Sequence, residues 1–282
     1  MVTDSHTIKN RAGTKRPSQK SANPNEALPG TQSIQRATLI LKEISTYGRN
    51  GIRLVDIAHA MQLERPTVHR IMRGLMSQGM VVQDAKTKTY RLGPVIYELG
   101  LAATPYYNLR EICQPTLQNL ANRTGDSVFL IVRSGMDGVC IDSLEGDFII
   151  KTRTLDIGGR RPLGAGAGGL ALLLQLSDEE IEQVIATNTP RFPLFGSLTE
   201  ARLRKAIELS RKVGYAVNDE DVLPGVAAIG APIINPNGTC YAALSIAGIT
   251  SRLQEPRRDQ MAKLLLKETR ALSRLLAEQQ PY

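Results

Sequence analysis

The chain has 282 residues, of which 42% are apolar, and this length predicts about two domains with cores of their own. Its formal net charge is +8, no apolar run approaches the length of a membrane-spanning helix, and the N-terminus lacks the apolar core of a signal peptide. Three widely spaced cysteines without a CxxC pair argue against a disulfide framework or a cysteine-based zinc site, so we expect a cytoplasmic protein.

The positive charge is concentrated in the N-terminal third. Residues 1–95 contain 15 Lys and Arg against 6 Asp and Glu, whereas residues 96–282 contain 20 against 21. Such asymmetry is typical of a polyanion-binding module joined to a nearly neutral one. Residues 1–30 are rich in Ser, Asn, Pro and basic side chains, which predicts a disordered basic tail. This tail is either simply solvated or a weak DNA-binding arm.

The next segments follow the order of a small DNA-binding domain. Apolar residues at helical spacing predict a helix that starts at Ser33 and ends at "GRNG" (48–51), and a short helix over 53–62. A third helix, over 64–78, has Pro66 in its first turn, and "MVVQ" and "TYRL" around "DAKTK" predict a β-hairpin. This order is that of a winged helix-turn-helix, which we assign to residues 31–92.

One side of the third helix is cationic and the other is apolar. Arginine can make bidentate contacts to guanine in the major groove, and lysines at a hairpin tip can contact phosphates. The alternative is a solvated basic helix, but the charge segregation, the order of elements and the hairpin together favour DNA binding. The predicted DNA-binding residues are Arg65, Thr67, His69, Arg70, Arg73, Lys86, Lys88 and Tyr90.

The rest of the chain predicts a linker helix within residues 93–107 and a mixed α/β domain over 108–282. Helices are predicted at "LREICQPTLQNLANRTG", "PLGAGAGGLALLLQL", "SDEEIEQVIA" with a capping box, "TEARLRKAIELSRKVG" and from about Glu255 to Gln280. Strands, joined largely by hairpins, are predicted at "SVFLIVRS", "GVCIDSL", "FIIKTRT", "VAAIGAPII" and "TCYAALSIAG".

A glycine-rich loop opens the apolar helix. Gly164, Gly166 and Gly169 match GxGxxG, but no buried strand precedes them and acidic residues follow too soon, which argues against a dinucleotide site. The backbone N–H groups of Gly166 and Ala167 could instead hold an anion at the helix N-terminus. Alternatively, the glycines only allow the helix to pack closely on a sheet. The polar cluster "NDED" (218–221) either lines a pocket mouth or is a solvated loop.

The distribution of histidines restricts the possible chemistry. The histidines are His6, His59 and His69, and residues 96–282 contain none. Neither a Ser-His-Asp or Cys-His arrangement nor a histidine-based metal site can form there, so we predict no catalytic residues, metal or cofactor. Cys140 alternates with apolar neighbours and is predicted to be a core residue. The alternatives to a regulator are an enzyme that works without histidine and a nucleoid-type protein that binds DNA without sequence preference.

These motifs resemble the IclR family of bacterial transcriptional regulators, from about residue 31 to 275. "SIQRATLILKEI", "LERPTVHRIMRGLMSQGMV" and "KTYRLG" resemble its winged helix-turn-helix, and "RRPLGAGAGGLALL", "GYAVNDEDVLPGVAAIGAPI" and "AALSIAG" resemble its effector domain. The resemblance implies an α+β protein with a GAF-like C-terminal domain, assembled as a homodimer or homotetramer. It also implies that a small organic acid or aromatic metabolite changes the affinity for a double-stranded DNA operator.

The resemblance further implies ligand contacts from the glycine loop, from the segment after "GY" with its following strand, and from "SIA". Some members have an aspartate in place of Asn218, a cysteine in place of Ala228 and a second serine in place of Ala247. The pocket is therefore less polar here, and we expect a larger or more apolar acid. The predicted effector-binding residues are Gly166, Ala167, Asn218, Asp219, Val226, Ala228, Ser245 and Ala247. The predicted function is a ligand-responsive, sequence-specific regulator of a catabolic or metabolic operon.

Overall fold

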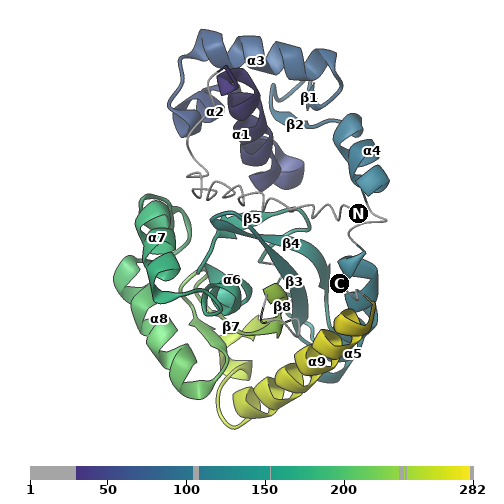
Figure 1. Cartoon of the computed structure of the whole chain (residues 1–282), viewed down its shortest axis with the longest axis vertical. Helices are drawn as coiled ribbons and strands as arrows, with labels where there is room; N and C mark the ends of the chain where they lie inside the picture. The colour runs from purple at the N-terminus through teal and green to yellow at the C-terminus, as the bar shows by residue number, and fades with distance from the viewer. Residues whose placement is uncertain (1–29, 104–107, 153, 235–237, 239, 280–282) are drawn as a thin grey trace, which may run out of the picture.

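A computed structural model describes residues 30–103, 108–152, 154–234, 238 and 240–279. They form an α+β protein with a small helical region at one end of its long axis and a larger region built on a sheet at the other (Figure 1). The predicted basic tail, apart from Gly30, and residues 104–107 of the predicted linker lie outside the described residues. None of the described helices is long and apolar enough to cross a membrane.

The small region, which we call the winged-helix domain, has the predicted order of three helices and a hairpin. Its core contains Ile40, Ile44, Ile57, Val68 and Met72, all at most 1% exposed. The left-handed conformation of Gln62 ends the second helix, and Pro66 lies in the first turn of the third. The elements are α1 (Gln32–Thr46), the 3-10 turn η1 (Gly48–Asn50), α2 (Leu54–Met61), α3 (Arg65–Ser77), β1 (Val81–Gln83) and β2 (Tyr90–Leu92), followed by α4 (Pro94–Ala103). Helix α1 thus begins just before the predicted Ser33.

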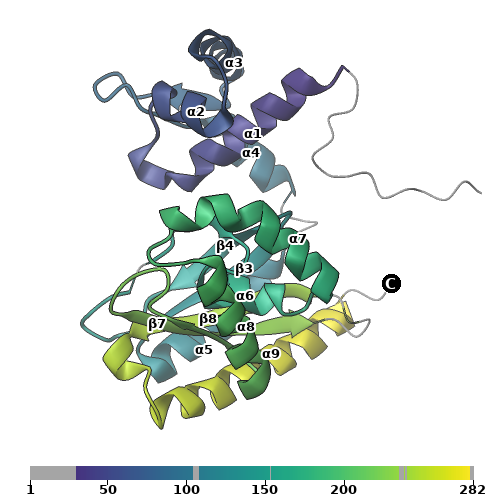
Figure 2. The same cartoon turned by 90° about the vertical axis from the view of Figure 1, so that its left-hand side faces the viewer.

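The larger region, which we call the sheet domain, is built on six antiparallel strands in the order β5-β4-β3-β8-β7-β6. Two helices pack on one face of the sheet and three on the other (Figures 1 and 2). The strands are β3 (Ser127–Ser134), β4 (Asp137–Leu144), β5 (Arg160–Pro162), β6 (Ala216–Asp219), β7 (Val226–Ile234) and β8 (Cys240–Ile249). The helices are α5 (Leu109–Thr124) and α9 (Arg257–Gln279) on one face, and α6 (Gly166–Leu173), α7 (Asp178–Asn188) and α8 (Glu200–Val213) on the other; η3 (Thr189–Leu194) and η4 (Thr250–Arg252) are short 3-10 turns.

Alternation along the central strands divides the interior of the sheet domain into two layers. Leu244 and Ile246 of β8 belong to the cluster with α5 and α9, whereas Ala243 and Ala247 belong to the cluster with α6, α7 and α8. Helix α7 begins with the predicted capping box, in which the hydroxyl of Ser177 accepts from a backbone N–H of the first turn. The small β8 side chains on the second face leave room beside α6.

Residues 148–152 and 154, the described part of the predicted strand at 148–154, do not form a strand. The place beside β4 is taken by β5, which pairs Val139 with Arg160. The apolar run is not covered, since the side chains of Ile149 and Ile150 are 87% and 53% exposed. β-branched residues favour strands mainly through packing, and these two isoleucines lack it. Conversely, β6 was not among the predicted strands.

The two regions meet where α1 contacts β5, at the end of the sheet domain that faces the winged-helix domain in Figures 1 and 2. Glu43 of α1 lies in this contact. Burial raises the pKa of its carboxyl group, and the charge of Arg191 in the sheet domain opposes the shift. Strand β5 therefore belongs to the sheet and also touches the winged-helix domain.

Candidate DNA-binding face and effector pocket

Helix α3 presents its predicted cationic residues to the outside. Val68, Met72 and Leu75 face the domain core, and α2 packs against α3. In both overall views α3 lies at the end of the molecule farthest from the sheet domain (Figures 1 and 2). The face opposite the core is open to solvent and holds Arg65, His69, Arg70 and Arg73, all exposed, with Thr67 partly exposed.

The cations of this face have no carboxylate partner in their own chain. Within the part of the chain that the structure describes, the winged-helix domain contains a single ion pair, between Arg91 and Asp84. Arg65, Arg70 and Arg73 take part in none. The field of the exposed α3 face is therefore free to act on an external polyanion.

The hairpin, whose strand β1 contacts α3, presents the two predicted lysines at its tip. Lys86 and Lys88 are both exposed. The carboxylate of Asp84 accepts hydrogen bonds from the backbone N–H of Lys86 at 2.9 Å and of Thr87 at 2.8 Å, and it pairs with Arg91 at 2.8 Å. These bonds, led by that from Thr87, lower the pKa of Asp84. The tip is thus fixed by a short network that leaves the lysines free.

Tyr90 is not on this face, contrary to the prediction. Its side chain is 5% exposed and belongs to the core of the winged-helix domain. Its backbone exchanges hydrogen bonds with Ile52, N–H to O at 2.7 and 3.0 Å. The buried side chain is therefore part of the domain core and is not available for contact with DNA.

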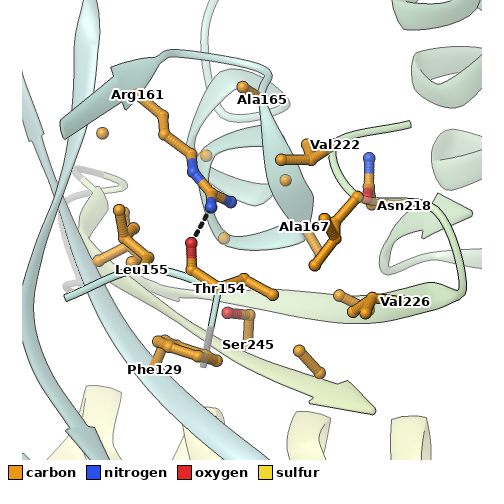
Figure 3. A pocket seen from close by; sticks show the side chains of 18 residues that line it. Phe129, Thr154, Leu155, Arg161, Ala165, Ala167, Asn218, Val222, Val226 and Ser245 are labelled. Carbon is orange, nitrogen blue, oxygen red and sulfur yellow. Dashed lines mark hydrogen bonds between the residues drawn. The ribbon is translucent and has the colours of Figure 1, made fainter. Parts of the chain in front are cut away.

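The sheet domain contains a cavity of about 50 Å³ between the start of α6 and strands β3, β7 and β8 (Figure 3). Seven of the eight predicted effector residues line it: Gly166, Ala167, Asn218, Val226, Ala228, Ser245 and Ala247. Asp219 does not, because successive side chains of a strand point to opposite faces and Asp219 follows the inward-facing Asn218. That these residues bind an effector stays a prediction.

The glycines at the start of α6 and on the facing strand β7 are needed for two different reasons. Gly166 begins α6 with a φ of +77°, in the left-handed region that favours glycine. A Cβ on Gly168 would lie 2.6 Å from the Ile131 side chain, and one on Gly230 would lie 2.3 Å from the carbonyl oxygen of Ala167. Close packing of helix on sheet therefore explains Gly168 and Gly230. The backbone at Gly166 and Ala167 still borders the cavity.

The cluster "NDED" (218–221) contributes Asn218, which lines the cavity, and Asp221, which accepts a hydrogen bond from Asn218. The side-chain amide of Asn218 donates to the carboxylate of Asp221 at 3.3 Å, and Asp221 pairs with Arg202 at 3.0 Å. Burial raises the pKa of Asp221, and Arg202 opposes the shift. Asp221 is largely buried, and its carboxylate holds the Asn218 amide at the cavity wall.

Sequence reasoning missed one charged residue of the cavity, Arg161. Strand β5 sends Arg160 to Asp137, at 3.1 Å, and Arg161 to the opposite side, where Figure 3 shows its guanidinium group reaching into the cavity. This group donates a hydrogen bond to the carbonyl oxygen of Thr154. Desolvation lowers the pKa of Arg161 to about 10. The available signal was the arginine pair directly before the glycine loop.

Two of the three cysteines are buried core residues, as predicted for Cys140, and Cys240 is partly buried. Cys113 and Cys140 are fully buried, and burial raises the pKa of both thiols to about 12. Burial likewise raises the pKa of Cys240 to about 11. A thiol with such a pKa is protonated at neutral pH and is a poor nucleophile. Over the described ranges, no three His, Cys, Asp or Glu side chains are grouped so that they could hold a metal ion.

Comparison with known proteins gives consistent matches along the chain. A model of the bacterial transcriptional regulator IclR C-terminal domain matches residues 102–274, and one of the IclR helix-turn-helix domain matches residues 33–85. The HTH-type transcriptional repressor AllR of Escherichia coli (strain K12) is 27% identical over 92% of this chain and 96% of its own length.

Solved structures share the fold. The Thermotoga maritima IclR structure is similar with a TM-score of 0.59 at 26% identity, covering 87% of this chain and 98% of that one. An IclR homolog from Microbacterium hydrocarbonoxydans, in complex with 4-hydroxybenzoate, is similar with a TM-score of 0.63 at 22% identity, covering 86% of this chain and 99% of that one.

Proposed function

This chain belongs to the IclR family of bacterial transcriptional regulators, and we propose that it controls a catabolic or metabolic operon in response to a small organic acid or aromatic metabolite. Its function is that of a DNA-binding transcriptional regulator, and we assign it no catalytic step. We place its action in the cytoplasm, where a bacterial operator is accessible.

The observation that carries this proposal is the exposed, unpaired cationic face of α3. A major groove admits one α-helix, and each bidentate arginine contact to guanine is worth roughly 1–3 kcal/mol of discrimination. We assign base reading to Arg65, Arg70 and Arg73, and contacts to bases or phosphates to Thr67 and His69. Lys86 and Lys88 on the hairpin contact phosphates, which sets the register of the protein on the duplex without reading sequence.

We propose that the protein acts as a homodimer or homotetramer through α4. This helix has no buried residue, and Tyr97, Leu99 and Leu101 are 70%, 55% and 53% exposed. Such an apolar helix favours association with another apolar surface, and a second copy supplies the same helix. A dimer places two α3 helices at half-sites separated by whole duplex turns.

We propose that the effector occupies the cavity beside α6 and changes operator affinity through β5. The 4-hydroxybenzoate complex of a relative supports an acidic or aromatic ligand. Strand β5 contributes Arg161 to the cavity and also contacts α1 of the winged-helix domain. A ligand that favours one position of β5 thereby favours one position of α1, with a coupling on the order of 1–3 kcal/mol.

The DNA-reading assignment is tested by selecting preferred duplexes from a random library with the purified protein, then comparing single variants by fluorescence anisotropy. Arg70→Ala is expected to weaken the selected duplex by about 1–3 kcal/mol and to relax preference at one position. Lys88→Ala is expected to weaken selected and random duplexes alike and to lower the salt slope by about one. Arg270→Ala, an exposed arginine of α9, serves as the matched control and should leave binding unchanged.

Two results would contradict the assignment. If library selection yields no preferred duplex, the protein binds DNA without sequence choice. If Arg70→Ala and Lys88→Ala affect selected and random duplexes identically, α3 does not read bases.

A further inference from the structure

Arg161 differs from the other partly exposed arginines of the sheet domain in having no carboxylate. Among the residues that the structure describes, no Asp or Glu forms an ion pair with it. The others are each neutralised: Arg160 and Arg191 pair with Asp137, Arg252 and Arg257 with Asp126, and Arg258 with Glu255. Taking a cation out of water without a partner is costly, so this position calls for a separate explanation.

The surroundings of Arg161 make its charge still less favourable. One guanidinium nitrogen, Nη1, lies 3.5 Å from the point where a Cβ on Gly166 would stand. Gly166 begins α6, and the N-terminus of a helix carries partial positive charge and unpaired N–H donors. A guanidinium group and a helix N-terminus therefore meet at one corner of the cavity. An anion between them would be stabilised by both.

The geometry leaves donors available for such an anion. A guanidinium group has five N–H donors, and the bond to the carbonyl oxygen of Thr154 uses one of them. The remainder of the group lies at the cavity (Figure 3). The other walls are mainly apolar, with Phe129, Leu155 and Val226 among them. One cationic corner and apolar walls match a ligand with a single carboxylate on an apolar body.

We propose that Arg161 binds the carboxylate of an organic monoacid in this cavity, together with the backbone N–H groups at the start of α6, and thereby selects acids over neutral ligands. This inference rests on the proposed effector function and deepens it. A diacid is disfavoured because its second carboxylate would face the apolar walls without a cation. The cavity of about 50 Å³ holds only a few heavy atoms, so larger acids require the walls to move.

The competing explanation is that Arg161 only ties the segment at Thr154 to β5. The two explanations predict opposite effects of Arg161→Met on the melting temperature without ligand. Removal of an unpaired, desolvated cation is expected to raise the melting temperature by about 2 °C or more, as ligand-binding groups are often held at a cost in stability. Loss of a purely structural tie would lower it. Arg133→Met, which removes an arginine outside the cavity, is the control.

The second measurement compares acids with their neutral counterparts on the full chain. Benzoate, 4-hydroxybenzoate and phenylacetate are each titrated beside the corresponding primary amide, with the melting temperature as readout. At least one acid is expected to raise the melting temperature of the unaltered protein more than its amide does. Arg161→Met should weaken binding of that acid roughly tenfold to a hundredfold and remove the preference over the amide. Arg133→Met should keep both.

The outcomes separate this inference from the effector proposal. If acids bind and Arg161→Met retains the same acid preference, the effector proposal stands and the assignment of Arg161 is wrong. If neither acids nor amides bind, the effector proposal loses its support. In that case the melting temperature of ligand-free Arg161→Met still decides between an unpaired binding group and a structural tie, and a fall would overturn the inference.

Discussion

The winged-helix domain and the sheet domain use their arginines in different ways. On α3, Arg65, Arg70 and Arg73 are exposed and have no carboxylate partner among the described residues. On α8, Arg204 pairs with Glu182 at 2.6 Å and with Glu200 at 3.0 Å. Exposed ion pairs add little stability, so pairing or not pairing these arginines has little effect on the free energy of unfolding. It does decide which surface keeps an uncompensated positive charge. Among the described residues, Arg204 is thus neutralised within its own domain, whereas the three α3 arginines keep their charge available for an external anion.

Arg161 extends this comparison into the interior. Most arginines of the sheet domain pair with a carboxylate, as Arg252 and Arg257 do with the buried Asp126. Arg161 has no such partner in the described structure and borders a cavity. The lack of an ion-pair partner among the described residues is thus shared by the arginines of the α3 face and by the arginine of the proposed carboxylate site.

The largest expected effect concerns α4, which joins the two regions and packs in the core of neither. The double substitution Tyr97→Glu and Leu99→Glu should convert the assembly to monomers. Operator affinity should then fall by about 100- to 10,000-fold, because the two half-sites are no longer bound together. Sedimentation velocity and fluorescence anisotropy measure the two effects. Glu98→Gln, a change between the two positions, is the control. A double variant that stays oligomeric would show that α4 is not the contact.

The next largest effect concerns the paired cations. Asp126→Asn removes the carboxylate shared by Arg252, at 3.0 Å, and Arg257, at 2.6 Å. Because Asp126 is buried and the two arginines are partly exposed, we expect a loss of about 2–4 kcal/mol in the free energy of unfolding. Asp178→Asn removes the exposed partner of Arg211 and should cost under about 1 kcal/mol. Urea unfolding followed by circular dichroism gives both values, and equal losses would contradict the distinction.

Much of the fold followed from periodicity and turn residues. The helices of the winged-helix domain, the hairpin and the capping box of α7 were predictable because each rests on local signals, such as helical spacing, Pro66 or Ser177 before Glu180. The strand predicted at 148–154 is absent from its described residues, 148–152 and 154, since β-branched composition does not reveal whether another strand already occupies the edge of β4.

Residues of the candidate sites could be predicted where a family motif marks them. They could not be predicted where tertiary packing determines which way a side chain points. Seven predicted effector residues line one cavity, but Asp219 faces away from it. This orientation could not be predicted because β6 was not recognised as a strand in the sequence, so the alternation of its side chains was not considered. Tyr90 is buried in a core that is formed by residues from several separate segments, among them Ile52, to which its backbone is bridged. Arg161 lies on a strand of three residues, too short for its inward side to be inferred from the sequence.

The claim that the unpaired arginines of α3 bind DNA, whereas paired arginines of the sheet domain do not, is tested by two matched triple variants. Arg65, Arg70 and Arg73 are changed to glutamine in one, and Arg133, Arg204 and Arg211 in the other. Affinity for the selected duplex and melting temperature are measured for both. The first variant is expected to lose at least roughly a thousandfold in affinity for the selected duplex, with its melting temperature unchanged. The second should keep its affinity and melt slightly earlier. Equal losses of affinity, or full binding by the first variant, would contradict the claim.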